Sequence, residues 1–218
     1  MASDQAETIA RGALRRGFRH LQGFLALSDQ QRLCNHISQI VAAAPLFTPK
    51  MPRTGRPFSV RMTSCGPLGW VSDKSHGYRY QETHPETGAP WPAMPRMLLD
   101  LWAELTDYPA PPEACLVNYY DAQAKMGLHR DEDEEDLSAP VISVSLGDTA
   151  RFRVGGTRRK DPTRSFDLVS GDVVVLAREA RLAYHGVDRI KPGTSDLLVQ
   201  DFPAGGRINL TLRRVTRP

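Results

Sequence analysis

The segment Arg-Ile-Asn-Leu-Thr-Leu-Arg at residues 207–213 alternates strictly between polar and aliphatic side chains. A period of two is typical of a β-strand with one polar and one apolar face. The polar face could be the wet side of an edge strand, or it could line the interior of a barrel and bind an anion. A second segment, Leu-Val-Asn-Tyr-Tyr at 116–120, places Asn118 and Tyr120 on one face, where they could donate to the same anion.

The chain around these two segments reads as mainly β. From about residue 113 onward, short apolar runs alternate with turn residues, and no helical pattern separates them. This texture is typical of an antiparallel jelly roll, or double-stranded β-helix. The predicted strands are 114–120, 141–146, 151–154, 165–168, 172–176, 182–185, 196–199 and 207–214.

Helical patterns are confined to the first half of the chain. Ser28 and Gln31 resemble a capping box, and apolar residues at helical spacing follow until Pro45. A second apolar stripe runs over residues 97–105, after Pro95. We therefore expect an α+β, mainly β fold in which residues 1–112 form a helical region packed against a jelly-roll core at 113–218, within a single integrated domain.

Composition is ordinary for a globular protein, but the charges are unevenly distributed. The 218 residues carry 28 basic and 25 acidic side chains, and six of the acidic ones form an unbroken run at 131–136. Arginine accounts for 23 of the basic residues and suits phosphate contacts, although composition alone favours a GC-rich coding bias. These values exclude a disordered chain, a coiled coil and a disulfide scaffold. Arginines near the start could contact phosphates, but a solvated terminal helix is the simpler account of Arg11, Arg15, Arg16 and Arg19.

The sequence predicts a cytoplasmic protein. No run of 18 apolar residues is present, and the first 17 residues lack the apolar core of a signal peptide. Cys34, Cys65 and Cys115 are odd in number and widely spaced, which favours reduced thiols. Nothing in the sequence indicates an oligomer, so we expect a monomer without membrane contact.

A candidate metal site begins at the acidic run. His129 and Asp131 are two residues apart, and His185 closes a short apolar segment further along the chain. Two imidazoles and one carboxylate form the facial triad of non-heme Fe(II) oxygenases, which leaves positions open for small ligands. A His-x-Asp pair is common by chance, so this pattern alone favours a solvated acidic loop with an unrelated histidine. Two arginines on a nearby strand could hold a small dicarboxylate, which is what a 2-oxoglutarate-dependent oxygenase requires.

Several motifs together resemble the AlkB family of Fe(II)/2-oxoglutarate-dependent dioxygenases, in particular its bacterial alkylation-repair branch. Their order and spacing match over roughly residues 55–215. The motifs are CGPLGW at 65–70, PWPAMP at 90–95, LVNYY at 116–120, GLHRDEDE at 127–134, APVISVSLG at 139–147, GGTRRKDP at 155–162, SGDVVVL at 170–176, YHGV at 184–187 and RINLTLR at 207–213.

The resemblance implies a cofactor and two co-substrates. The triad would bind Fe(II), with 2-oxoglutarate and O₂ as co-substrates. Arg207, with Tyr120 and Asn118, would hold the distal carboxylate of 2-oxoglutarate. Arg213, with Asn209, would hold the end that chelates iron. The implied reaction removes N-linked methyl groups from damaged DNA bases and releases formaldehyde, succinate and CO₂.

The resemblance also implies a nucleotide-recognition lid in the N-terminal region. Trp70 would stack a flipped base against the first triad histidine, and Tyr78 would reach the nucleotide backbone. Asp133 would contact the amino edge of the base, which favours cationic lesions such as 1-methyladenine and 3-methylcytosine. Pocket-edge positions are matched by Met62 and Arg159.

Other residues of the same regions are expected to be structural. Trp91, between two prolines, should pack a loop, and the rest of the acidic run should stay solvated, namely Glu132, Glu134, Glu135 and Asp136. Two alternatives remain at this point. The same chemistry could act on alkylated RNA or tRNA in place of single- or double-stranded DNA, or the chain could be a non-catalytic jelly-roll binding module. The binding module predicts that the polar side chains of 207–213 face bulk water and that the two triad histidines lie far apart.

Overall fold

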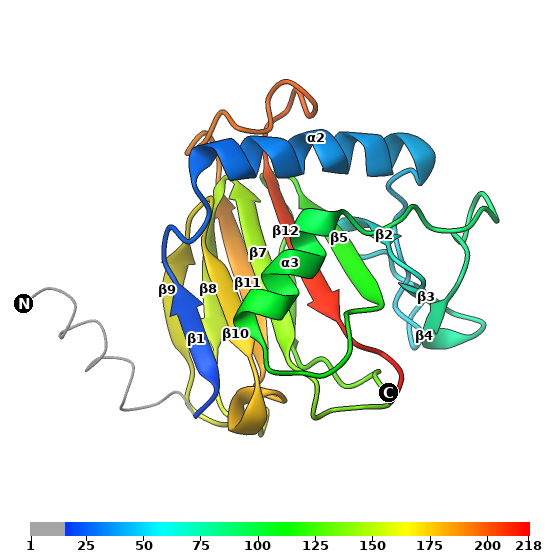
Figure 1. Ribbon diagram of the computed structural model, residues 1–218, viewed down its shortest axis with the longest axis vertical. Coiled ribbons are helices and arrows are strands. Elements are labelled where there is room, and N and C mark those ends of the chain that lie inside the picture. The colour runs from blue at the N-terminus through cyan, green and yellow to red at the C-terminus, as the bar shows by residue number, and fades with distance from the viewer. Residues whose placement is uncertain (1–15) are drawn as a thin grey trace, which may run out of the picture.

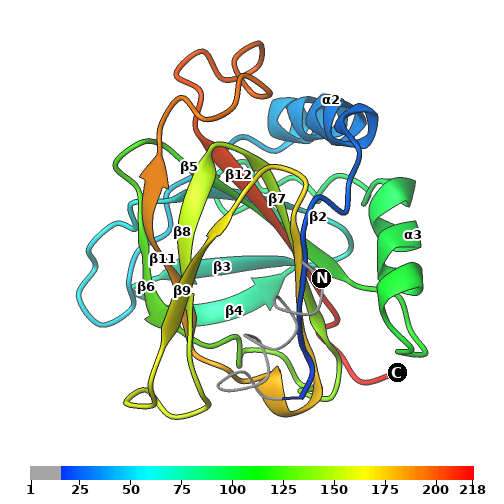
Figure 2. The same ribbon diagram turned by 90° about the vertical axis from the view of Figure 1, so that its left-hand side faces the viewer.

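The computed structural model describes residues 16–218, so Arg11 and Arg15 lie outside the described residues. Two antiparallel sheets face one another (Figures 1 and 2). The larger sheet has six strands in the order β1 (Phe18–Leu21), β10 (Val173–Leu176), β7 (Val141–Gly147), β12 (Arg207–Arg213), β5 (Ala114–Tyr120) and β2 (Arg61–Cys65). The smaller sheet has four strands in the order β6 (Met126–His129), β11 (His185–Lys191), β8 (Thr149–Val154) and β9 (Arg164–Leu168).

Two helices cover the outer face of the larger sheet. The longer helix, α2 (Leu27–Ala43), crosses the end of that sheet, and α3 (Arg96–Leu105) lies on its face (Figure 1). A separate hairpin of β3 (Gly69–Asp73) and β4 (Gly77–Gln81) lies beside β2, on the side of the molecule away from β1 (Figure 1). A short 3₁₀ turn, η1 (Arg178–Ala180), precedes β11. The mainly β, α+β fold expected from the sequence is therefore confirmed.

The alternation in β12 separates the core from the interior of the fold. Ile208, Leu210 and Leu212 are buried in one hydrophobic cluster with residues of both helices. The odd-numbered residues of the strand point to the other side, into the space between the two sheets. β12 lies at the centre of the larger sheet, hydrogen-bonded to β5 and β7. Its polar face is therefore internal, and an edge strand with a wet face is the wrong interpretation.

The N-terminal region does more than pack helices on the sheet. It contributes both edge strands, β1 beside β10 and β2 beside β5. Four of the five residues of β2 are buried although its sequence is partly polar, because its neighbours cover both faces. The regions 1–112 and 113–218 thus share one sheet. No helix of the described region, residues 16–218, is long and apolar enough to cross a membrane.

Four local predictions were wrong. Arg19 lies in strand β1 and not in a terminal helix. The α2 helix starts at Leu27 with Ala26 as its N-cap, so Ser28 lies within the first turn and makes no capping hydrogen bond. The predicted strand at 196–199 is a turn that buries Leu198 in the core, with the partly buried Leu197 packed against it. The strand predicted at 182–185 in fact begins at His185 and ends at Lys191. A bulge after Val187 breaks its alternation of buried and exposed residues.

Candidate active site

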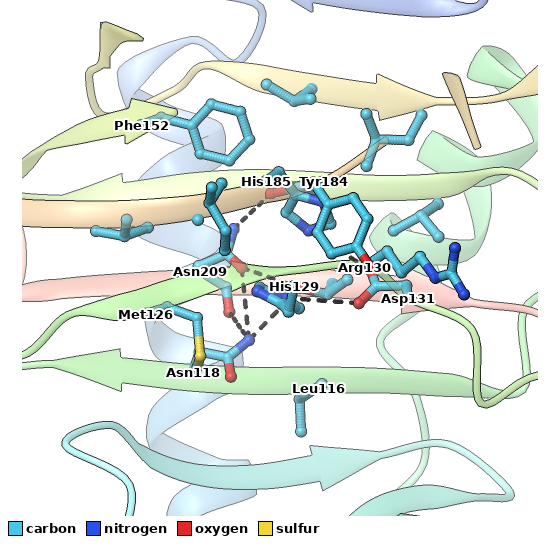
Figure 3. A pocket seen from close by; sticks show the side chains of 18 of the residues that line it. Leu116, Asn118, Met126, His129, Arg130, Asp131, Phe152, Tyr184, His185 and Asn209 are labelled. Atoms are coloured by element: carbon cyan, nitrogen blue, oxygen red, sulfur yellow. Dashed lines mark hydrogen bonds and ion pairs between the residues drawn. The ribbon is translucent and has the colours of Figure 1, made fainter. Parts of the chain in front are cut away.

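The three candidate metal ligands converge where β6 and β11 pair. His129 ends β6 and is the direct register partner of His185, the first residue of β11. The two imidazole centroids are 4.5 Å apart, and the potential ligand atoms of the triad all lie within 4.8 Å of one another. Asp131 follows β6 by two residues, and its carboxylate oxygens lie 3.7 and 3.9 Å from the Nε2 atoms of the two histidines. Figure 3 shows these side chains pointing toward one another.

Backbone carbonyls orient both histidines. The Nδ1 atoms of His129 and His185 lie 2.9 Å from the carbonyl oxygens of Gly127 and Ala183, respectively. An Nδ1–H that donates to a carbonyl leaves Nε2 as the free lone pair, which is the usual arrangement of a metal-bound histidine. Burial lowers the pKa of His185 to about 4, so its imidazole is neutral and able to act as a ligand.

The carboxylate of Asp131 has the properties of a divalent-cation ligand. Burial raises its pKa, but nearby positive charge, above all the Arg213 guanidinium, outweighs burial and holds the pKa well below its ordinary value. Its Oδ1 atom forms an ion pair with Nη2 of Arg213 at 2.8 Å. Its Oδ2 atom is buried and has no hydrogen-bond partner among the described residues. An ionised, buried and unpartnered oxygen beside the Nε2 atoms of two imidazoles fits a metal such as Fe(II).

The expected 2-oxoglutarate residues lie next to the triad on β5 and β12. Tyr120 is the register partner of Arg207, and Asn118 is the register partner of Asn209, so all four share the inner face of the sheet. The Nδ2 atom of Asn209 donates to the Ser143 hydroxyl at 2.6 Å, which fixes its orientation. These residues form the floor of the cavity, with Asn118 and Asn209 visible in Figure 3.

Arg207 is buried almost without polar partners. It is 1% exposed, and its Nη2 atom donates to the Ser145 hydroxyl at 2.8 Å. Its Nε and Nη1 atoms are buried and unpartnered in the described part of the chain. Burial lowers the pKa of Arg207 to about 10, and the pKa of Tyr120 is raised to about 12 by the same cause. A guanidinium with two free donors in an enclosed site suits a carboxylate ligand.

The hairpin of β3 and β4 forms the opposite wall of the cavity. Trp70 and Tyr78 stack with ring centroids 5.4 Å apart, and Tyr78 is half exposed. The indole Nε1 of Trp70 donates to the Asp133 carboxylate at 2.8 Å, so the hairpin contacts the acidic run directly. Met62 lies buried at the cavity wall, and Arg159 lies at its rim, where its Nη1 atom donates to the carbonyl oxygen of Leu128 at 2.9 Å.

All thirteen residues expected from the sequence line one cavity of about 400 Å³. The binding-module alternative is wrong on both of its counts, because the polar residues of β12 face this cavity and the two histidines are direct neighbours. Trp91 is buried, donates to a carbonyl oxygen and does not line the cavity, which confirms its packing role. Sequence reasoning missed Phe58 and Phe152, which also line the cavity, and no local pattern marks them.

The acidic run at 131–136 is not uniformly solvated, so the expectation that Glu134 and Asp136 stay solvated is wrong. The Glu134 side chain is fully buried in an ion pair with Arg181 at 2.9 Å. Asp136 accepts a hydrogen bond from the Tyr108 hydroxyl at 2.5 Å. Glu132 and Glu135 are exposed, as expected. An unbroken acidic run carries no periodic signal, so the sequence could not indicate which member folds inward.

A jelly-roll-like β fold with a His-x-Asp…His triad beside buried arginines defines a 2-oxoglutarate- and Fe(II)-dependent oxygenase. The family model described as the 2OG-Fe(II) oxygenase superfamily matches residues 17–213. The "Alpha-ketoglutarate-dependent dioxygenase AlkB homolog" of Caulobacter vibrioides is 56% identical over 198 residues, which is 91% of this chain and 87% of that protein. The "Alpha-ketoglutarate-dependent dioxygenase AlkB" of Escherichia coli is 41% identical over 193 residues, covering 87% and 86%. The chain therefore belongs to the AlkB family.

Solved structures agree with this assignment. The one described as "The structure of OsALKBH1" superimposes with a TM-score of 0.77 at 33% identity, covering 92% of this chain and 98% of that one. A 2OG-Fe(II) oxygenase family protein from Burkholderia pseudomallei has a TM-score of 0.55 at 14% identity and supports the fold alone. The chain is an Fe(II)- and 2-oxoglutarate-dependent dioxygenase, and the activity of its family is the oxidative dealkylation of methylated nucleobases.

Proposed function

We propose that this enzyme demethylates cationic N-methylated bases in DNA, with 1-methyladenine and 3-methylcytosine as the preferred lesions. The observation that carries this proposal is the composition of the two walls of one cavity. One wall offers the triad and two arginines, and the other offers an aromatic stack beside the Asp133 carboxylate. A carboxylate at that position would favour a base that methylation has made positive.

The metal and 2-oxoglutarate would be held by the residues already described. His129, Asp131 and His185 are the proposed Fe(II) ligands, and when bound the iron supplies the oxidising chemistry with O₂ and 2-oxoglutarate. Arg207 would neutralise the distal carboxylate of 2-oxoglutarate, with Tyr120 and Asn118 as hydrogen-bond donors. Arg213, with Asn209, would orient the end of the co-substrate near the metal. Arg207, Tyr120 and Asn118 are 1%, 4% and 5% exposed, so bulk water would have little access to that end of the cavity.

The base would enter from the open side, beside the hairpin of β3 and β4, which would act as the nucleotide-recognition lid. Trp70 would stack a base extruded from the strand, and the half-exposed Tyr78 would contact the backbone next to it. Asp133 would accept a hydrogen bond from the amino edge of the base. Met62 and Arg159 would bound the pocket laterally.

RNA is the second candidate substrate. A protein named "tRNA demethylase abh1" from Schizosaccharomyces pombe is 34% identical over 110 residues, which is 47% of this chain and 36% of that protein. A pocket that reads a flipped base has little contact with the sugar, so the same residues would accept either nucleic acid. DNA is preferred because the protein named "DNA N(6)-methyladenine demethylase ALKBH1C" from Arabidopsis thaliana, 29% identical, matches 92% of this chain, whereas the tRNA demethylase matches 47%.

The test is a side-by-side turnover assay. Single-stranded DNA, duplex DNA and RNA oligonucleotides, each with one 1-methyladenine or 3-methylcytosine, are incubated with enzyme, Fe(II), ascorbate and 2-oxoglutarate. We expect equimolar formaldehyde and succinate with the DNA substrates. Faster turnover of the RNA would favour the second candidate, and absence of base-dependent turnover with all three would overturn the proposal. We further propose that the enzyme is a cytoplasmic monomer, in line with its three free buried cysteines.

A further inference from the structure

A buried charge network lies behind the proposed metal site. Glu134 follows Asp131 by three residues, and its side chain is fully buried. Its Oε2 atom accepts from the Arg181 guanidinium at 2.9 Å. Its Oε1 atom accepts from the hydroxyl of Tyr80 and lies 3.4 Å from Nη1 of Arg213. Glu134 thus touches an arginine that follows the 3₁₀ turn, a tyrosine from β4 and the arginine that ends β12.

Arg181 uses its other nitrogen atoms to hold the backbone of the acidic loop. Its Nη1 atom donates to the carbonyl oxygen of Asp131, and its Nε atom donates to the carbonyl oxygen of Ala139, both at 2.6 Å. These two carbonyls mark the start and the end of the loop that carries the acidic run. With its third contact to Glu134, one buried guanidinium fixes the loop at three points.

Arg213 is held from the same side. Its Nη1 atom donates to the Tyr80 hydroxyl at 2.9 Å, and its Nη2 atom pairs with Asp131 at 2.8 Å. Its Nε atom is buried and has no partner among residues 16–218. Two carboxylates and two guanidinium groups therefore balance in charge within one buried cluster. Apolar residues of similar volume often stabilise a fold as well as such a pair does, so stability does not explain its presence.

We propose that Glu134 and Arg181 are positioning residues that fix the carboxylate of Asp131 and the guanidinium of Arg213 for the metal and 2-oxoglutarate. Neither lines the cavity, so each acts only through the residue that it holds. Arg181 fixes the position of the Asp131 backbone through its hydrogen bond to the Asp131 carbonyl oxygen. Glu134 fixes the orientation of the Arg213 guanidinium through its ion pair with Nη1. The inference rests on the function proposed above for Asp131 and Arg213.

The test compares four variants with the wild type. Glu134→Gln keeps the side-chain shape and removes the charge, and Glu134→Leu/Arg181→Met replaces both partners with apolar groups. Glu135→Gln is the matched control, because it removes the neighbouring charge from an exposed side chain. Arg213→Met removes the proposed ligand contact itself. For each protein, the affinity for 2-oxoglutarate is measured as a Kd by calorimetry with Mn(II) in place of Fe(II). The Tm and the Michaelis constants for the co-substrate and for a methylated oligonucleotide are measured in parallel.

We expect Glu134→Gln to weaken 2-oxoglutarate binding at least tenfold, in the Kd as well as in the Michaelis constant, while the Michaelis constant for the oligonucleotide changes less than threefold. The double variant should have a Tm near that of the wild type but the same weak 2-oxoglutarate binding, which a merely structural pair would not produce. A double variant with wild-type affinity, or Glu134→Gln within twofold of the wild type, would overturn the inference. In that case the wild type still reports on the proposed function separately, because that function also requires the wild type to bind 2-oxoglutarate and to turn over a methylated oligonucleotide.

Discussion

Replacing Arg207 with methionine should stabilise the ligand-free protein and abolish tight binding of 2-oxoglutarate. Burial lowers the pKa of Arg207 from its ordinary 12.5 to about 10. At 1.36 kcal/mol for each tenfold change in acidity, this corresponds to about 3 kcal/mol by which the folded protein disfavours the charge. Loss of the hydrogen bond to Ser145 destabilises the variant by about 1 kcal/mol. The free energy of unfolding should therefore rise by a net amount of about 2 kcal/mol. For a chain of this length, that gain raises Tm by about 4–8 °C.

The effect on ligand binding has the opposite sign. The Nε and Nη1 atoms of Arg207 are buried and lack hydrogen-bond partners in the described residues, so both are free to donate to the co-substrate. Each hydrogen bond to a charged group contributes about 1.5–3 kcal/mol, so the loss of two such bonds amounts to about 3–6 kcal/mol. The Kd for the co-substrate should therefore rise by a factor of about 10² to 10⁴.

Differential scanning fluorimetry with Mn(II), with and without 2-oxoglutarate, measures both effects. A ligand that binds only the folded state raises Tm in proportion to the logarithm of its concentration over Kd, so the wild type should respond and the variant should not. Arg214→Met is the control, because Arg214 pairs with Glu113 at 3.4 Å and does not line the cavity. The reasoning is refuted if the Arg207→Met protein has a lower Tm than the wild type, or if it keeps the wild-type response to 2-oxoglutarate.

Three further perturbations test other parts of the structure. A Cβ atom added at Gly186 would lie 2.6 Å from the carbonyl oxygen of Met126, so Gly186→Ala should push β11 away from β6. The affinity for Mn(II), measured by calorimetry, should fall about 10- to 100-fold. Unchanged affinity would contradict the role given to this strand pair. Asp133→Ala should impair demethylation of 3-methylcytosine while sparing the uncoupled consumption of 2-oxoglutarate, and equal loss of both activities would contradict its role in reading the base. Asp172 accepts from His20 and from two backbone amides, and although burial raises its pKa, these bonds lower it overall. Asp172→Asn should therefore cost about 2–4 kcal/mol in urea unfolding at pH 7. Because the folded pKa is the lower one, this difference should shrink as the pH falls below about 4, and a constant difference down to pH 2 would refute the linkage.

The sequence predicted the interior of the site better than its surroundings. Strict alternation in β12 placed Arg207, Asn209 and Arg213 on one face, and a central strand has no freedom to shift its register once the other face is buried against helices. The same alternation in β7 puts Ser143 and Ser145 beside these residues. Arg207, Asn209 and Arg213 come from a strand with an uninterrupted period of two, which is why their common face could be predicted.

The elements that were missed have no such period. β11 contains a bulge between Val187 and Arg189, so its register breaks two residues after His185. β2 is buried through contacts with distant segments, which local sequence cannot reveal. The inward turn of Glu134 depends on Arg181, 47 residues away along the chain. Long-range partners of this kind decide burial by tertiary packing rather than by any property of the neighbouring residues.

The uneven charge of the chain follows from these contacts. The acidic run supplies one proposed metal ligand, Asp131, and one buried anion, Glu134, and each is matched by a buried guanidinium. A neutral cluster of this kind can accept a divalent cation and a dianion together without leaving a net charge in the interior, whereas either ligand alone would leave one. Electrostatics therefore predicts that the metal and 2-oxoglutarate bind cooperatively, because each ligand lowers the desolvation cost that the other would meet. Arg207 lies outside this neutral cluster, and its positive charge attracts the 2-oxoglutarate dianion into the cavity.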